Sequence, residues 1–577
     1  MDTIKREITL PFLFRLDVRA LLCSAVLAVV GFVVLYPLFL LLLNSFQVGR
    51  PTVHPNQELT YGFDNWVAAL TQPGMLKALL NTTELTFLLQ LISFPVAIVI
   101  VWLLARTDIP AKNWFEFLFW IAFFAPSLPI TLGWVLLLDP DFGLLNQALK
   151  HVFSFGKSFL NIYSFWGIVW VHLATKSIVV KVILLTPLIR NLDASFEEAS
   201  RVSGAGLLRT ITRIVVPVMA PAIMVVMILS ILYSLESFEI EQVLGPPFNF
   251  FVYSTMIYRL LEVQPAQYGS ATALAVVILI AMAPLIFLQH QISKSRRYTT
   301  IQGQYKARLF SLRAWRWPAF ALVLSLGLLF TLLPILFLVL ATLMRLFGFF
   351  NLPNPWTLEH WERVLSDPIF LHSLRNTLLL GAGAVLLAVI WYPLIAYIAV
   401  RTRYKARQVL DFLSWLPIAI PGIILGLGFL WLFLGTAVFR PFYGTIFVLI
   451  LAAAISSMTL GVQLVKSNLL QLGQDLEEAS WVAGAAWFYT FRRVVLPILA
   501  PVLVTVGLVA FIAATRNIAG IALLVTNQNR PLAMLQLDYM VDGRYEAAAV
   551  VGVIVMLLTS GVALIARVFG LRFGIRN

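Results

Sequence analysis

The chain has 577 residues, of which 60% are hydrophobic and only 12% are charged. A soluble globular domain could not keep this composition in water, so a polytopic membrane protein is predicted. The 41 basic and 27 acidic residues give a formal net charge of +14. The basic residues gather in short loops between apolar segments, which is typical of the positive-inside rule, so no nucleic-acid partner is expected.

A membrane-spanning helix needs about 20 mostly apolar residues. Segments of this kind occur six times before and six times after a basic linker at residues 293–317. They lie near residues 20–46, 82–105, 115–138, 160–189, 212–235, 268–290, 318–345, 376–400, 408–436, 443–468, 494–515 and 547–569. The predicted fold is therefore all-α, with about twelve transmembrane helices in a lipid bilayer.

One motif with fixed internal spacing occurs twice, each time in a polar stretch between two apolar spans. The two copies consist of Glu198-Ala199-Ser200 with Gly204, Ile214 and Pro217, and of Glu478-Ala479-Ser480 with Gly484, Val494 and Pro497. The differences 478 − 198, 484 − 204 and 497 − 217 all equal 280. Because each copy lies between the fourth and fifth spans of its half, two parallel six-helix repeats are predicted, at residues 1–292 and 318–577.

A second repeated pattern supports this division. Asn81-Thr82 and Asn376-Thr377 open the second span of each half, and Arg106-Thr107 and Arg401-Thr402 close it. Here 376 − 81 and 401 − 106 both equal 295. The shorter offset of the motif is explained by a shorter loop in the second half, since loops tolerate changes of length.

Each motif copy is predicted to form a short helix on the membrane surface, at about residues 192–210 and 473–490. Asp193 or Ser195 can cap the first helix and Asp475 the second. The acidic pairs, Glu197-Glu198 and Glu477-Glu478, then lie in the first turns, where the helix dipole favours negative charge. Gly204 and Gly484 permit a tight turn in a backbone conformation that is unfavourable for residues with a side chain. The distribution of basic residues places both copies and both chain termini in the cytoplasm.

The motif resembles the E-A-A-x(3)-G-x(9)-I-x-x-P pattern of the permease subunits of binding-protein-dependent ABC importers, with Ser200 and Ser480 in place of the second alanine. Other segments, including Ser237-Phe238-Glu239 and Asp542-Gly543-Arg544, look like the fused ferric-iron-type permeases, a group that also holds thiamine and 2-aminoethylphosphonate permeases.

The resemblance implies the type I importer permease fold in a bacterial cytoplasmic (inner) membrane. It implies a soluble substrate-binding protein on the outer face and two copies of an ABC ATPase subunit inside. The residues expected to couple to those ATPases are Glu197, Glu198, Ala199, Ser200, Gly204, Glu477, Glu478, Ala479, Ser480 and Gly484. The alternative to a coupling role is that both copies are ordinary amphipathic loops with capping acids.

The chain itself is predicted to hold no ATP site and no cofactor. Its nearest phosphate-loop lookalike is Gly156-Lys157-Ser158, but His151 stands where the first glycine is needed. ATP and magnesium are therefore expected on the partner ATPase subunits. No nucleophile, base and metal-ligand constellation can be assembled, so the chain is expected to be a transport subunit and not an enzyme.

Polar groups within apolar spans are costly and are the first candidates for a transport pathway. The candidates are His172, Lys176, Lys181, Glu236, Glu239, Arg516 and Asn517. Glu236 and Arg516 are related by the offset of 280, so they are expected to face one another. They would form an outer gate or a passing contact for the solute, or, as the favoured alternative, a structural ion pair. The lysines are expected to snorkel or to pair with Glu236 or Glu239, and His172 to be a core histidine. No metal cluster is indicated.

Proline and glycine interrupt the third span of each half, and kinks are expected near Pro126 and Pro421. The outer loops at 47–77, 241–266, 346–370 and 517–544 are the sizeable exposed regions expected on the outer face, and they could receive the binding protein.

The predicted function is ATP-driven import of a small solute by alternating access. Ferric iron is favoured as the solute because of the resemblance, with 2-aminoethylphosphonate, thiamine or another small solute as alternatives. A secondary transporter of the major-facilitator kind also has six plus six spans. However, Arg106-Thr107-Asp108 and Arg401-Thr402-Arg403 do not supply the charged loop signature that such a carrier needs.

Overall fold

A computed structural model describes residues 18–48, 60–153, 158–190, 200, 202–295, 310–349 and 352–568. The regular secondary structure in the described part of the first half is helical, apart from two short strands, β1 (Gln47–Val48) and β2 (Thr60–Tyr61), which pair antiparallel. Its helices are α1 (Val18–Ser45), α2 (Asp64–Thr71), α3 (Met75–Arg106), α4 (Lys112–Phe124), α5 (Ser127–Leu138), α6 (Leu144–Phe153), α7 (Phe165–His172), η1 (Leu173–Ser177), α8 (Ile178–Arg190), α10 (Leu207–Thr210), η2 (Ile211–Val215), α11 (Val216–Leu235), α12 (Glu239–Leu244), η3 (Pro246–Phe248), α13 (Tyr253–Glu262) and α14 (Tyr268–Ser295).

The second half follows the same order. Its helices are η4 (Arg313–Trp315), α15 (Arg316–Gly327), η5 (Leu328–Leu332), α16 (Leu333–Leu343), α17 (Glu359–Ser366), α18 (Pro368–Arg401), α19 (Arg407–Trp415), η6 (Leu416–Ala419), α20 (Gly422–Gly435), η7 (Arg440–Phe442), α21 (Ile446–Gln471), α22 (Asp475–Val482), α23 (Trp487–Thr490), η8 (Phe491–Val495), α24 (Leu496–Arg516), α25 (Leu532–Val541) and α26 (Tyr545–Val568).

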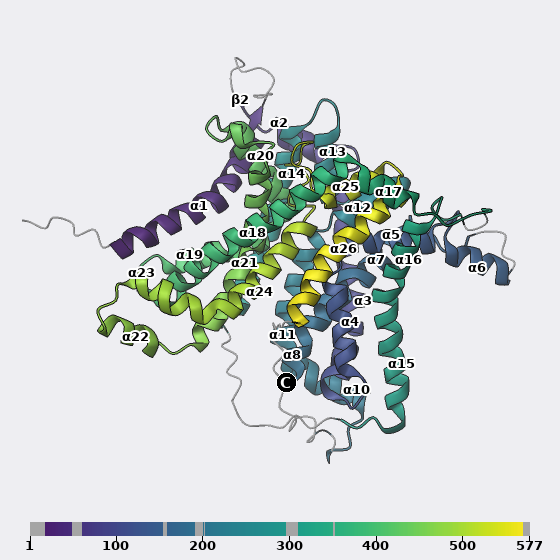
Figure 1. Ribbon diagram of the computed structural model, residues 1–577, viewed down its shortest axis with the longest axis horizontal. Helices are drawn as coiled ribbons and strands as arrows, with labels where there is room; N and C mark the ends of the chain where they lie inside the picture. Colours follow the sequence, from purple (N-terminus) through teal and green to yellow (C-terminus); the bar gives the residue numbers. More distant parts are fainter. Residues whose placement is uncertain are drawn as a thin grey trace, which may run out of the picture.

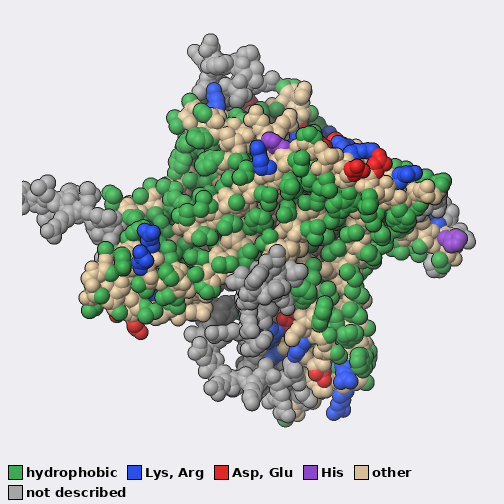
Figure 2. All heavy atoms as spheres, viewed as in Figure 1, with side chains coloured by type: hydrophobic (Ala, Val, Ile, Leu, Met, Phe, Trp, Pro, Cys, Tyr) green, Lys and Arg blue, Asp and Glu red, His purple; other side chains and the backbone are tan. Residues whose placement is uncertain are grey.

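Ten helical stretches in the described ranges are long and apolar enough to cross a membrane, and two bent helix pairs bring the count to twelve. Figure 2 shows hydrophobic side chains covering the middle of the molecule, with charged side chains mostly toward its two ends. This is the surface that a lipid bilayer requires of a spanning protein. The predicted all-α, multi-span fold is confirmed.

The first span of each half packs against the other half. Helix α1 lies against α19 and α20 of the second half, while α16 lies against α5 of the first. Figure 1 shows the two helix bundles meeting in the upper part of the molecule, with α10 and α22–α23 at separate lower extremities. We call the side that carries these three helices the motif end, and the opposite side the far end. The two halves are thus held together because each packs its first span against the other half.

The third span of each half is broken, not merely kinked as expected. Helices α4 and α5 meet at 101°, and the α19–η6 stretch meets α20 at 112°. Pro126 and Pro421 follow Ala125 and Ile420, whose backbones are extended. A proline disfavours the helical conformation of the residue before it and lacks an N–H donor, so the helix ends there. Each break leaves backbone groups without helical partners in the protein interior.

Two segments expected as outer loops fold back into the core. In α25 nearly every residue from Leu532 to Met540 is buried, and most of α13 is buried as well. The prediction that 241–266 and 517–544 form exposed docking loops is therefore wrong for these helices. Residues 531–537 are mostly apolar and include no charged residue, and this signal could have indicated the burial of α25.

The repeated Asn-Thr pairs hold these segments in place. The Asn81 side chain donates to Phe251 O (2.9 Å), and the Thr82 hydroxyl accepts from Tyr253 N (3.0 Å) at the start of α13. In the second half the Asn376 side chain donates to Gln528 O (3.1 Å) and Arg530 O (3.2 Å), and Thr377 accepts from Leu532 N (2.8 Å). The same sequence pair therefore anchors the same folded-back helix twice.

The chain enters the second half along the end of α3. Phe310 N donates to Arg106 O (2.7 Å), and the Asp108 carboxylate accepts from Leu312 N (2.9 Å) and from the Ser311 hydroxyl (3.1 Å). The bond from Leu312 N holds the pKa of Asp108 below its usual value. The division at 292 and 318 stays a prediction; α14 ends at Ser295 and α15 begins at Arg316.

Replacing Gly133 by alanine is expected to destabilise the protein by about 1–3 kcal/mol. A Cβ atom at this position would lie 2.2 Å from Pro334 O, so α5 and α16 would have to move apart. Thermal unfolding of the purified protein measures the loss. Gly561→Ala in α26 is the matched control, because a Cβ there meets nothing within 4 Å. Equal melting temperatures for the two variants would contradict the close packing of α5 on α16.

Candidate functional site

The second motif element, residues 475–490, consists of α22, a tight turn and α23. Gly484 has φ +84°, a left-handed conformation that glycine adopts at low cost. Around it Gly484 N donates to Trp481 O (2.9 Å) and Ala485 N donates to Ser480 O (3.0 Å). The Ser480 hydroxyl lies 2.9 Å from the Thr490 hydroxyl and so joins α22 to α23. The turn predicted from the motif is present, and it is closed by a side-chain contact.

The described part of the first motif element, residues 200 and 202–210, repeats this geometry. Gly204 has φ +75°, Ala205 N donates to Ser200 O (3.0 Å), and the hydroxyls of Ser200 and Thr210 lie 2.8 Å apart. Since 480 − 200 and 490 − 210 both equal 280, the serine–threonine contact is itself part of the repeat. Glu197, Glu198 and Ala199 lie outside the described residues.

Glu477 and Glu478 are adjacent in the sequence, but their environments differ. Glu477 is buried; its Oε1 lies 3.0 Å from Arg401 Nε, and its Oε2 accepts from the Tyr397 hydroxyl (2.6 Å). Arg401 also donates to Leu469 O (2.9 Å) and Leu472 O (2.6 Å). Glu477 therefore fastens α22 to the ends of α18 and α21, and its expected part in coupling to an ATPase stays a prediction. Glu478 and Ala479 are exposed.

Both motif elements carry an apolar residue in nearly full exposure. Val202 is 90% exposed and Val482 is 89% exposed, each two residues before its glycine. The second element also exposes Phe488 and Tyr489. Neighbouring apolar residues exposed on a polar surface segment are typical of a protein-interaction site. The apolar residues exposed together on the second element thus favour a docking surface there, and Val202 stands at the equivalent position of the first element.

Glu236 and Arg516 do not pair with one another; no ion pair joins them among the described residues. Glu236 Oε1 accepts from Gly422 N (3.2 Å), and the Arg516 guanidinium donates to Phe123 O (2.9 Å). The predicted direct pairing is therefore wrong. Both side chains do reach the opposite half. Asn517 Oδ1 accepts from Gly520 N (3.0 Å), which closes a turn after α24.

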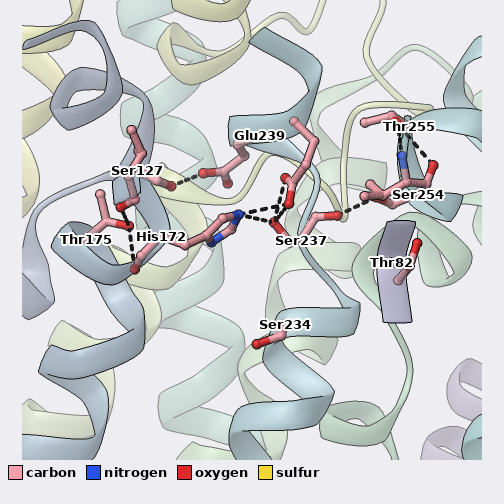
Figure 3. Close-up of polar contacts among 12 residues, drawn as sticks. Thr82, Ser127, His172, Thr175, Ser234, Ser237, Glu239, Ser254 and Thr255 are labelled. Carbon is pink, nitrogen blue, oxygen red and sulfur yellow. Dashed lines mark hydrogen bonds and ion pairs between the residues drawn. The ribbon is translucent and has the colours of Figure 1, made fainter. Parts of the chain in front are cut away.

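The corner between α11 and α12 holds two further carboxylates, each bound within the first half (Figure 3). Glu239 accepts from the Ser127 hydroxyl at the start of α5. Glu241, fully buried, lies 2.8 Å from His172 Nε2 and accepts from the Ser237 hydroxyl (2.6 and 2.7 Å). His172 is thus a hydrogen-bonded core residue, as expected. Ser127 and Ser237 were not among the predicted site residues; Ser237 was noted only as part of the Ser237-Phe238-Glu239 segment, and a lone serine such as Ser127 gives no sequence signal.

The two lysines differ in their exposure to solvent. Lys176 is exposed. Lys181 is buried: its Nζ donates to Ser177 O (3.0 Å) and lies 4.7 Å from the centre of the Phe94 ring. No ion pair between either lysine and Glu236 or Glu239 occurs among the described residues. Among those residues no group of three or more His, Cys, Asp and Glu side chains could hold a metal ion.

Glu477→Ala is expected to lower the free energy of unfolding by about 3–5 kcal/mol, because it leaves Arg401 buried without its carboxylate. Glu478→Ala removes an exposed side chain and is expected to change stability by less than about 0.5 kcal/mol. Thermal melting of the two purified variants distinguishes them. A large loss of stability in Glu478→Ala, with none in Glu477→Ala, would contradict these roles.

The sequence is similar to those of several known transport proteins. Over 453 residues the chain is 26% identical to the ferric transport system permease protein FbpB of Actinobacillus pleuropneumoniae, which covers 76% of this chain and 63% of that protein, so less than two thirds of that relative is matched. It is 24% identical over 539 residues to the Fe(3+)-transport system permease protein FbpB 2 of Haemophilus influenzae, covering 91% of this chain and 97% of that one. The sulfate transport system permease protein CysT of Salmonella typhimurium is 32% identical over 196 residues, 32% of this chain and 68% of CysT.

One family model matches the chain twice, at residues 93–298 and 386–574, which is more than half of its length. Each match contains one motif element and the helices on either side of it. The chain therefore belongs to the family of binding-protein-dependent transport system inner membrane components, as a fused double repeat of the permease.

Proposed function

We propose that this permease imports ferric iron, delivered by a soluble binding protein, and that two copies of a separate ABC ATPase subunit drive it. The observation that carries the ATPase part is the pair of motif elements with the same turn, the same serine–threonine contact and the same exposed valine. Two related docking surfaces suit two copies of one motor protein. The positive-inside pattern supports a cytoplasmic position for the motif end and both termini in a bacterial inner membrane.

The mechanism rests on the attachment of each motif element to a spanning helix. Helix α11 follows the first element through η2, and α24 follows the second through η8. ATP binding would draw the two ATPases, and with them the motif elements, together. The helices would then open the far end to the binding protein, and hydrolysis would restore the resting state. ATP and magnesium remain on the ATPases throughout.

Iron as the cargo is supported by the two FbpB relatives, which match most of the chain. In this mechanism ferric iron is a passing solute and not a resident cofactor of the permease. 2-Aminoethylphosphonate, thiamine and other small solutes remain the competing cargoes, since the similarity to a sulfate permease shows that related sequences serve anions. An ATPase-independent secondary carrier is the competing mechanism.

The docking role is tested by co-purification. The double variant Glu198→Ala/Glu478→Ala is expected to lose most of its bound ATPase, while Glu359→Ala, which removes an exposed carboxylate on α17, keeps it. Both preparations should contain equal amounts of folded permease. Iron uptake by vesicles that hold the permease without any ATPase would refute the ATP-driven mechanism in favour of a secondary carrier.

The cargo is tested in the assembled complex in proteoliposomes. An iron-loaded binding protein is expected to raise ATP hydrolysis and to deliver radioactive iron to the lumen. Binding proteins loaded with 2-aminoethylphosphonate, thiamine or sulfate are the controls. Stimulation by one of these, with none by the iron-loaded protein, would assign that cargo instead.

A further inference from the structure

Two contacts join the halves at the breaks of the third spans. The first is made by Glu236, which directly follows α11. Its Oε1 accepts from the backbone N–H of Gly422, the first residue of α20 in the other half (3.2 Å). The first N–H groups of a helix have no partner within it, and the helix dipole favours negative charge there. Glu236 thus supplies a missing acceptor at the broken end of α20.

The second contact is made by Arg516, the last residue of α24. Its guanidinium donates to the carbonyl of Phe123 (2.9 Å) in the last turn of α4, and it lies 5.7 Å from the centre of the Phe123 ring. The last carbonyls of a helix also lack partners, and positive charge is favoured there. Arg516 thus supplies a missing donor at the broken end of α4.

These contacts are related by the repeat. Since 516 − 236 equals 280, Glu236 and Arg516 occupy equivalent positions at the ends of equivalent helices. Each crosses to the broken third span of the opposite half, and each carries the charge that suits the helix end it meets. The other carboxylates of the α11–α12 corner, Glu239 and Glu241, bind partners within their own half. Among the hydrogen bonds and ion pairs given above for these four side chains, those of Glu236 and Arg516 cross between the halves.

There is little free space around the Glu236 contact. A Cβ atom on Gly422 would lie 3.0 Å from Glu236 Oε1 and 2.9 Å from Gly520 N. Helix α20 therefore approaches both the carboxylate and the turn after α24 closely. A side chain at position 422 would press on both, so the glycine is required by this close approach.

The contacts lie at the opposite ends of α11 and α24 from the motif elements. These helices have 20 and 21 residues, which corresponds to about 30 Å each. We infer that Glu236 and Arg516 are positioning residues that hold the far gate closed at rest, and that both contacts break when ATP binding draws the motif elements together. This inference rests on the proposed ATP-driven mechanism and adds the place where the pathway is closed.

Loosening the gate tests the inference through a gain of activity, which damage to the fold would not produce. In the assembled complex Glu236→Ala and Arg516→Ala are each expected to raise ATP hydrolysis in the absence of binding protein by about fivefold to tenfold, because the resting state loses a charge-assisted hydrogen bond. Glu236→Gln keeps an acceptor oxygen and should have a smaller effect. Glu84→Ala removes an exposed carboxylate of α3 and should leave the basal rate unchanged. Unchanged or lower basal hydrolysis in both alanine variants would overturn the inference.

ATP-dependent transport by the unmodified complex is measured beside these variants, so that a failure of the proposed mechanism is recognised separately.

Discussion

Backbone groups left unpaired at helix ends set the main constraint on this structure. In a lipid-embedded protein water cannot satisfy them, so each interrupted helix must find partners within the protein. Pro126 and Pro421 interrupt the third spans and create four such ends near the junction of the halves. Charged side chains from the neighbouring fifth spans meet two of them, and the Ser127 hydroxyl with Glu239 lies at a third. Three of the polar residues that first suggested a pathway, Glu236, Glu239 and Arg516, thus lie at the breaks.

The two halves repeat their backbone geometry more closely than their side-chain chemistry. Lys181 corresponds to Gly461, since 461 − 181 equals 280, and Ala97 corresponds to Tyr392, since 392 − 97 equals 295. In the second half the Tyr392 ring fills the space at Gly461, where a Cβ would lie 2.2 Å from the ring. In the first half the equivalent positions hold Lys181 and Ala97, and the Lys181 Nζ lies 4.7 Å from the centre of the Phe94 ring. Equivalent positions of the two halves are therefore filled by side chains of different size and polarity.

The repeated motifs and the apolar spans could be predicted from the sequence. A side-chain contact that depends on where another helix packs could not be predicted. The spans, the two turns at Gly204 and Gly484 and the repetition of the Asn-Thr pairs follow from composition and spacing, whereas the anchoring role of those pairs does not. The difference between Glu477 and Glu478 does not, because adjacent helical residues point about 100° apart and only the position of α18 decides which one meets Arg401. The expected pairing of Glu236 with Arg516 failed for a related reason. Their equivalent positions indicated that both lie near the junction of the halves. Each of them, however, bonds to a backbone group at a proline break instead of to the other.

The serines of the motif suggest how force passes from the surface elements into the spans. The family pattern has alanine where this chain has Ser200 and Ser480, and each serine is bonded to a threonine ten residues later, across the glycine turn. A turn closed only by backbone bonds around a left-handed glycine could flex. The added hydroxyl contact, worth about 1 kcal/mol, ties the two arms together. Arg401 and Tyr397 hold α22 through Glu477 from the other side. In the proposed mechanism, a motif element fixed in this way would move as one body with its spanning helices, and a displacement of its exposed valine would reach the far end instead of being absorbed in the turn.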